Sequence, residues 1–228
     1  MENPTSSSFE AVHSGGAGLS RSPWFAMWIR PRETIQRIVD TDPKRSVLML
    51  AALSGIATSL NQRCRSNAGD TLSLSEIFSG SVLQGPVVGL VVLYLGAFMI
   101  RLTGKWLGGT ASLVTIRAAL AWAHVPMLWG MLLWIPQLTL FGKEMFTSEM
   151  PRVCADGRLH LLFWKLGSVD IAIGLWTIVV QLKCLGQIQG FSFLKALANA
   201  VLAYLLTLLV FAVPIVLAIV LFRGSIPW

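Results

Sequence analysis

The sequence predicts an all-α protein, a polytopic membrane bundle of five transmembrane helices preceded by an amphipathic interfacial helix. Of its 228 residues, 54% are hydrophobic and only 13% are charged, whereas soluble domains carry about 25% charged residues. The apolar residues come in long runs, and the mean hydropathy is +0.67. Long apolar runs with few charges are typical of membrane-spanning helices. These observations exclude a soluble protein of one or two domains.

The net charge of +7 indicates membrane flanks rather than nucleic-acid binding. Lys and Arg accumulate on the cytoplasmic side of membrane helices. The chain has no compact basic and aromatic patch on a separate soluble segment. We therefore expect the lipid bilayer as a partner and no nucleic acid.

The first 22 residues are polar and rich in Ser and Gly, so they predict a disordered cytoplasmic tail. Such a segment cannot bury enough apolar surface to fold. It also lacks the apolar core of a secretory signal, so we expect no cleavage.

Residues 23–40 predict the interfacial helix. Ile35, Ile38 and Val39 recur at helical spacing, with polar residues between them. Indole rings and basic side chains both favour the membrane–water boundary. The residues expected to contact the membrane surface are Trp24, Trp28, Arg30, Arg32 and Arg37. The alternative is a cap that packs on the helix bundle.

Five spans follow within a membrane domain of residues 23–223. They are predicted at residues 46–61, 82–102, 116–141, 161–182 and 196–222. The first is shorter than the roughly 20 residues that a bilayer needs. Pro126 and Pro136 are expected to kink or end the third. Polar loops are predicted at 63–81 and 142–160, and residues 224–228 form a short C-terminal segment.

The Lys and Arg residues also predict the orientation. With five spans, more of the 18 basic residues fall on the N-terminal side of the membrane than on the other side. Because basic residues stay cytoplasmic, we expect the N-terminus inside and the C-terminus outside.

Glycines mark both ends of the second span. Gly85, Pro86 and Gly89 form a small-xxx-small pattern that lets helices approach closely, although glycine is also common in membrane helices. Gly108 and Gly109, in the link after the span, predict a tight turn between helices.

Three polar residues at predicted membrane depth are candidates for function: His124, Asp170 and Asn199. His124 lies beside Pro126, and its ring is expected to satisfy backbone that the proline frees. Asp170 is expected to bind neighbouring helices or Lys165. The alternative is that these groups form a polar path.

No catalytic, metal or cofactor motif occurs, so we predict no enzyme, metal or cofactor. None of the three cysteines belongs to a Cys-x-x-Cys pair. Cys64 and Cys154 fall in predicted exterior loops, where a disulfide and two free thiols are both open.

Four stretches carry a family resemblance. They are residues 23–35, residues 85–86, residues 107–112 with 121–126, and residues 176–196. In order and spacing they cover nearly all of the chain from Pro23 onward. In them the chain resembles the Yip (Ypt/Rab-interacting protein, Yip-one domain) family of five-span membrane proteins, in its bacterial branch.

The resemblance implies a membrane domain without a catalytic signature. Eukaryotic members organise vesicle traffic and engage Rab-type GTPases. Their Asp-Leu-Tyr-Gly-Pro segment is reduced here to Leu83-Gln84-Gly85-Pro86, and their long cytosolic N-domain is missing. Both departures argue against a GTPase partner.

Two hypotheses follow. The first is a non-enzymatic scaffold or organiser in the bacterial inner membrane, acting through helix packing, head-group contacts, and other membrane proteins or self-association. The second is a transporter or lipid-moving protein whose polar path involves His124, Asp170 and Asn199.

Overall fold

The computed structural model describes the backbone of residues 22–223 and the side chains of residues 22–213. In this part of the chain all regular structure is helical, as predicted. The α-helices are α1 (Pro23–Ile29), α2 (Pro31–Thr41), α3 (Val47–Arg65), α4 (Leu74–Trp106), α5 (Leu113–Ala123), α6 (Val125–Gly130), α7 (Trp134–Phe141), α8 (Pro151–Ala155), α9 (Gly157–Gln189) and α10 (Phe193–Arg223). Short 3-10 helices lie between them: η1 (Ala68–Asp70), η2 (Met131–Leu133) and η3 (Gly142–Phe146). Nearly all of the predicted tail and the C-terminal segment 224–228 lie outside the described residues.

Four helical segments of the described chain are long and apolar enough to cross a membrane. They are Leu74–Trp106, Leu113–Phe146, Gly157–Gln189 and Phe193–Val213. Four of the five predicted spans coincide with these segments. The other, residues 46–61, corresponds to α3, which is not among the four because polar and basic residues crowd its second half.

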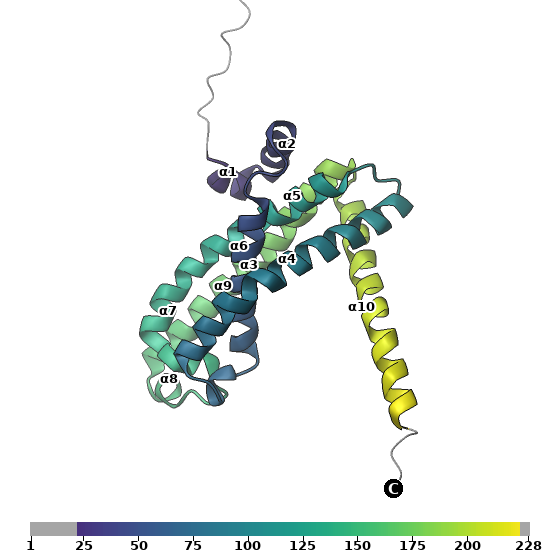
Figure 1. Cartoon of the computed structure of the whole chain (residues 1–228). Coiled ribbons are helices and arrows are strands. Elements are labelled where there is room, and N and C mark those ends of the chain that lie inside the picture. The colour runs from purple at the N-terminus through teal and green to yellow at the C-terminus, as the bar shows by residue number, and fades with distance from the viewer. Residues whose placement is uncertain (1–21, 224–228) are drawn as a thin grey trace, which may run out of the picture.

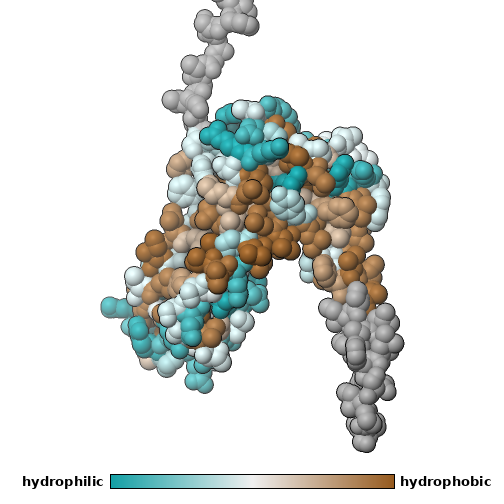
Figure 2. Space-filling model, in the orientation of Figure 1, coloured by the Kyte–Doolittle hydropathy of each residue, from teal (hydrophilic) through white to brown (hydrophobic). Residues whose placement is uncertain are grey.

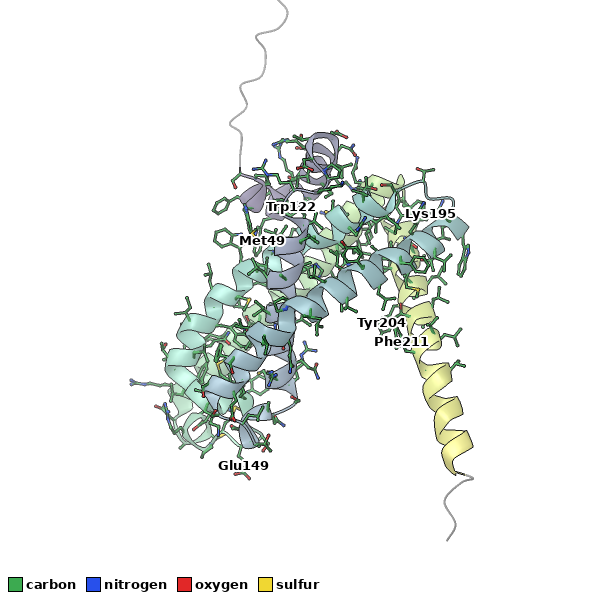
Figure 3. All side chains as sticks on the ribbon, in the orientation of Figure 1. Met49, Trp122, Glu149, Lys195, Tyr204 and Phe211 are labelled. Carbon is green, nitrogen blue, oxygen red and sulfur yellow. The ribbon has the colours of Figure 1, made fainter. Side chains whose placement is uncertain are left out.

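The helical bundle has two ends (Figure 1), and hydrophilic residues gather at both (Figure 2). We call one the cap end: it carries α1, α2 and the turns at 107–112 and 190–192. The other, the far end, carries η1, η3 and α8. An apolar band separates the two ends (Figure 2), and Trp122 and Lys195 lie toward the cap end while Glu149 lies at the far end (Figure 3). α10 packs on α4 and α9 near the cap end and then diverges from the bundle.

The cap consists of α1 and α2, each of which begins at a proline, a residue that suits the first helical turn. Thr34, Ile35 and Ile38 of α2 are buried, and the helix packs on α9 and α5. Its apolar side therefore contacts protein rather than lipid, as in the alternative of a packed cap. The charged side chains of Arg32 and Arg37 remain exposed.

α4 begins earlier than the predicted second span because of a capping box. The Ser73 hydroxyl accepts from the Glu76 backbone N–H, and the Glu76 carboxylate accepts from the Ser73 N–H. The predicted loop 63–81 is shortened accordingly. With 33 residues, α4 is about 50 Å long at 1.5 Å per residue. It crosses the molecule obliquely (Figure 1).

The predicted third span is not one helix but a series, α5, α6, η2 and α7. The first break falls at His124, two residues before Pro126. The loop predicted at 142–160 is also largely structured: it holds η3 and α8 and buries Met145, Phe146 and Val153 in an apolar cluster at the far end.

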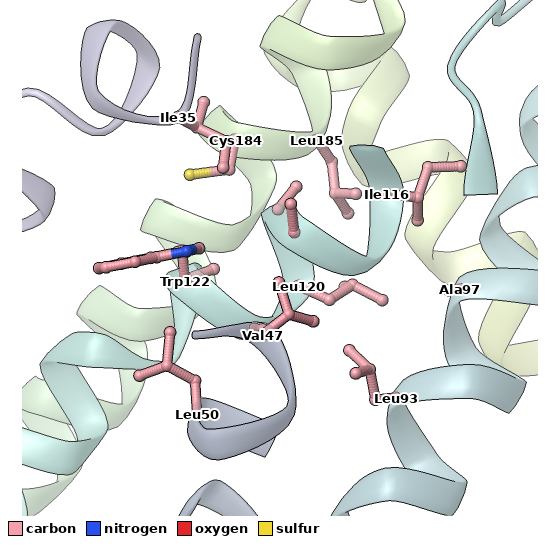
Figure 4. Close-up of a cluster of buried hydrophobic side chains, with 14 of the residues drawn as sticks. Ile35, Val47, Leu50, Leu93, Ala97, Ile116, Leu120, Trp122, Cys184 and Leu185 are labelled. Atoms are coloured by element: carbon pink, nitrogen blue, oxygen red, sulfur yellow. The ribbon is translucent and has the colours of Figure 1, made fainter. Parts of the chain in front are cut away.

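A larger apolar cluster closes the bundle toward the cap end (Figure 4). Val47 and Leu50 of α3 meet Trp122 of α5 and Leu185 of α9 there. The Trp122 indole N–H donates to the Arg45 carbonyl at 3.2 Å, which fixes the chain that leads into α3.

Candidate functional site

Five polar side chains of α3 lie along one face of the helix. Each of them lies three or four residues from another of the five, which is the spacing of one helical face. They are Ser54, Thr58, Asn61, Gln62 and Arg65. All five line one or both of two cavities. We call these two cavities together the α3 groove.

The first cavity has a volume of about 210 Å³ and lies between α3, α4, α5 and α9. Its polar lining includes Ser54, Thr58, His124 and Gln181. The Ser54 hydroxyl is buried without a hydrogen-bond partner in the described part of the chain. The rest of the wall is largely apolar, with Leu93 as an example.

His124 owes its position to the break between α5 and α6. Its backbone N–H donates to the Ala121 carbonyl at 3.3 Å, which leaves the Leu120 carbonyl without its helical donor. The ring Nδ1 of His124 lies 2.7 Å from that carbonyl oxygen. Because a carbonyl only accepts, Nδ1 carries the hydrogen, and in the neutral ring Nε2 is then an acceptor.

The second cavity has a volume of about 310 Å³ and lies between α3, α6, η2, α7 and α9. Asn61, Gln62 and Arg65 line it from α3, and Asp170 lines it from α9. The Gln137 amide Nε2 donates to the Asp170 carboxylate at 2.6 Å. Asp170 therefore binds a neighbouring helix, which is one of the two partners expected for it.

The two cavities share Thr58, so their polar lining is continuous. From Ser54 to Arg65 the lining follows α3 for about 16 Å at 1.5 Å per residue. This is roughly half of the 30 Å hydrocarbon thickness of a bilayer. The residues of α3 before the groove, Val47 and Leu50, are buried in the apolar cluster. The groove therefore has its polar lining toward the far end, and the apolar cluster blocks it toward the cap end.

Asn199, the third predicted candidate, does not reach the groove. It is buried where α10 meets α4, and its Oδ1 accepts from the Thr103 hydroxyl at 2.6 Å. A Cβ on Gly104 or Gly109 would overlap the buried Gln189 side-chain oxygen beside it. Gly109 therefore makes room for Gln189, while Gly108 adopts a positive φ of 80° that glycine tolerates.

Gly85 and Gly89 face α3. A Cβ on Gly85 would lie 2.6 Å from the Ile56 Cα, and a Cβ on Gly89 would lie 2.8 Å from the Gly55 Cα. Both distances are too short for a real side chain. The small-xxx-small pattern therefore serves close packing, and Pro86 lies between its glycines inside α4.

The two cysteines of the predicted exterior loops are free thiols. The Cys64 thiol is partly buried and donates to the Met145 carbonyl at 2.8 Å. Cys154 is exposed on α8.

Sequence reasoning missed the α3 side of the groove and Gln137. The signal was present as a polar residue every three or four positions from Ser54 to Arg65. It was hidden because the predicted span ended at residue 61 and the following residues were assigned to a loop. Within the described residues no cluster of three or more His, Cys, Asp or Glu side chains could hold a metal ion.

Comparison with known proteins gives a family match. The model of the Yip1 domain matches residues 25–214. No curated protein and no solved structure gives a significant match. With its long apolar helices and a family match over most of its length, the chain belongs to the Yip1 domain family and is a multi-pass membrane protein.

Proposed function

We propose that this protein is a non-enzymatic organiser in a membrane. The observation that carries the proposal is the cap, in which α2 and the residues on either side of it hold basic side chains outward while the apolar side of α2 packs on the bundle. The exposed basic residues at this end are Arg30, Arg32, Arg37, Lys44 and Arg45. Such a surface suits acidic head groups or an acidic protein neighbour.

We propose that α3 crosses the membrane and is the first of five spans. Its 19 residues extend about 28 Å at 1.5 Å per residue, close to the 30 Å hydrocarbon thickness of a bilayer. Gly55 of α3 lies against Gly85 and Gly89, so α3 packs tightly on a helix that is itself apolar enough to span. Its polar face lines the groove, which accounts for its lower hydropathy.

The orientation that we propose places the cap end in the cytoplasm and the far end outside. Basic residues outnumber the acidic Glu33, Asp40 and Asp42 at the cap end. At the far end the basic residues are balanced by Asp70, Glu76, Glu144, Glu149 and Asp156. We place the protein in a bacterial inner membrane because four stretches of the chain resemble the bacterial branch of the family.

Site-specific photo-crosslinking in native membranes tests the organiser role. A crosslinking residue in place of Arg32 should capture a defined protein neighbour or a second copy of the chain. Arg30→Gln with Arg37→Gln should weaken that capture. A crosslinker in place of Arg158, which is exposed near the far end, is the matched control. Equal capture at both positions, or none at Arg32, contradicts the proposal.

A second candidate function is transport or lipid movement, and the α3 groove favours it. His124 and Asp170 both line the groove, whereas Asn199 does not. The polar lining covers about half of a bilayer, so passage requires the cluster around Leu50 and Trp122 to open.

Reconstitution in liposomes separates the two functions. Lipid scrambling or solute flux by the wild-type protein that is lost in a folded Asp170→Leu variant supports the second. Absence of flux in the wild type under every imposed gradient leaves the organiser role.

A further inference from the structure

We propose that the second cavity of the α3 groove binds a zwitterionic group in which a phosphate is joined by a short linker to an ammonium. The head group of an aminophospholipid has this chemistry. The site goes beyond the organiser role, and it requires only that the chain lies in a membrane, not that it moves lipid.

The charges of the cavity carry the inference. Arg65 and Asp170 line the same space from α3 and α9, yet they form no ion pair with each other. Asp170 has one side-chain partner, the Gln137 amide on its Oδ2. Asp170 is half-buried within α9, and ionisable groups at membrane depth normally are paired. Arg65 is exposed at the end of α3, where its guanidinium is open to a ligand at the mouth of the cavity. A ligand with one phosphate and one ammonium pairs both, since guanidinium binds phosphate through two parallel hydrogen bonds.

The neutral lining fits the same ligand. Asn61 donates its amide to the Ala57 carbonyl at 3.0 Å, which leaves its side-chain oxygen free to accept from an ammonium. Gln62 and Thr58 add further polar groups on the same wall. The volume of about 310 Å³ lies at the lower end of the range for small-molecule sites. A head group fits this space, whereas the acyl chains would have to remain outside it.

The opposite wall supplies an apolar boundary and an opening. Trp134 and Ile173 line the cavity, and Gly174 completes the α9 side. A Cβ on Gly174 would meet nothing within 4 Å. A larger side chain therefore has room at this position, and because Gly174 lines the cavity we expect its added volume to narrow the site.

Gly167 is a matched control for that position. It lies seven residues earlier on α9, on the same face, and a Cβ on it would also meet nothing within 4 Å. It does not line the cavity. Replacing either glycine by leucine removes the unfavourable helix propensity of glycine to the same extent. Only Gly174→Leu is expected to narrow the site.

The test is native mass spectrometry of the purified full chain titrated with phosphatidylethanolamine, with phosphatidylglycerol, which lacks the ammonium, and with soluble O-phosphoethanolamine. We expect saturable binding of one phosphatidylethanolamine. Arg65→Gln, Asp170→Asn and Gly174→Leu should each weaken it roughly tenfold or more, as expected for loss of a charged hydrogen bond or of the space. Gly167→Leu should leave it unchanged. Phosphatidylglycerol should lose affinity with Arg65→Gln but not with Asp170→Asn.

The outcomes separate cleanly. Binding of O-phosphoethanolamine with the same variant dependence supports the site and makes the ligand a soluble zwitterion, and binding of the lipid alone supports a head-group site. Equal affinity of the wild type for both lipids, with no response to Asp170→Asn, overturns the proposal. So does full binding by Gly174→Leu. A negative crosslinking result at Arg32 concerns the organiser role only and does not touch this site.

Discussion

His124 shows how one side chain serves both the backbone and a cavity. Its Nδ1 repairs the carbonyl that the α5–α6 break leaves free, and the residue lines the first cavity of the groove. The repair fixes which nitrogen carries the hydrogen, because the carbonyl oxygen of Leu120 can only accept. A leucine at this position would keep the volume but leave that carbonyl unpaired.

We therefore predict that His124→Leu lowers the free energy of unfolding by about 1–3 kcal/mol, the cost of an unpaired buried polar group. The measurement is unfolding of the detergent-solubilised protein by titration with sodium dodecyl sulfate. His160→Leu is the control, because His160 is exposed near the far end, and it should change stability by no more than about 0.5 kcal/mol. Similar effects of both substitutions would show that the Leu120 contact contributes little.

The closest helix pair, α3 and α4, depends on glycines that leave no room for a Cβ. Gly89 packs against the backbone of Gly55, whereas Gly96, seven residues further along α4, has only a Leu120 methyl carbon at 4.0 Å from the position of its Cβ. The two glycines thus lie on the same face of one helix but in different surroundings. The comparison separates packing from helix propensity.

Gly89→Ala should destabilise the protein by about 1–3 kcal/mol through overpacking. Gly96→Ala should be neutral or should stabilise it by up to about 1 kcal/mol, because alanine favours the helix. The same detergent titration measures both variants. Stabilisation by Gly89→Ala would mean that α3 and α4 do not pack as closely as described.

α10 is held to the bundle near its start by a buried polar contact. Thr103 of α4 donates to Asn199 of α10, and Gln189 of α9 lies against the adjacent glycines of the α4–α5 turn. From this contact to residue 213, the last whose side chain is described, the large apolar side chains of α10 are mostly exposed. The contact therefore sets where α10 leaves the bundle.

A double-mutant cycle of Thr103→Val and Asn199→Leu should give a coupling energy of about 0.6 kcal/mol, with roughly 1.7 kcal/mol as the upper end for such contacts in membranes. Hydrogen exchange of α10 should rise in either single variant. A cycle of Thr103→Val with Thr207→Val is the control, because the Thr207 hydroxyl binds its own helix at Ala203. Equal coupling in the two cycles would remove the assigned role of the Thr103–Asn199 pair.

The cap end and the far end of the molecule differ in charge, and cysteine labelling can show which end faces the cytoplasm. Cys154 is exposed at the far end, while Cys184 is fully buried in the bundle and therefore cannot report on the cap end. Thr110, exposed in the turn at 107–112, is a better cap-end position for a cysteine.

With the cap end in the cytoplasm, a membrane-impermeant maleimide should label Cys154 in intact cells and Thr110→Cys only after permeabilisation. Cys64 should react more slowly, because its thiol is partly buried and donates to the Met145 carbonyl. Labelling of Thr110→Cys in intact cells with Cys154 protected would reverse the orientation.

Properties that depend on neighbours along the chain could be predicted from the sequence. Hydropathy predicted the four long apolar segments, and the ionisable side chains of His124 and Asp170 stood out within apolar runs. These signals are local, since a helix forms its backbone hydrogen bonds within its own segment and a membrane span must be apolar along its own length. The family resemblance rests on the same stretches.

Only the tertiary structure decided which side chains face one another. Arg65 lines the same cavity as Asp170, and Asp170 accepts a hydrogen bond from Gln137. Asn199 lies in the contact between α4 and α10 and not in the predicted polar path. The physical reason is that rotation and register between helices follow from side-chain packing, here from the glycine contact of α3 with α4. Periodicity shows that α3 has a polar face, but the neighbouring helices determine what that face encloses.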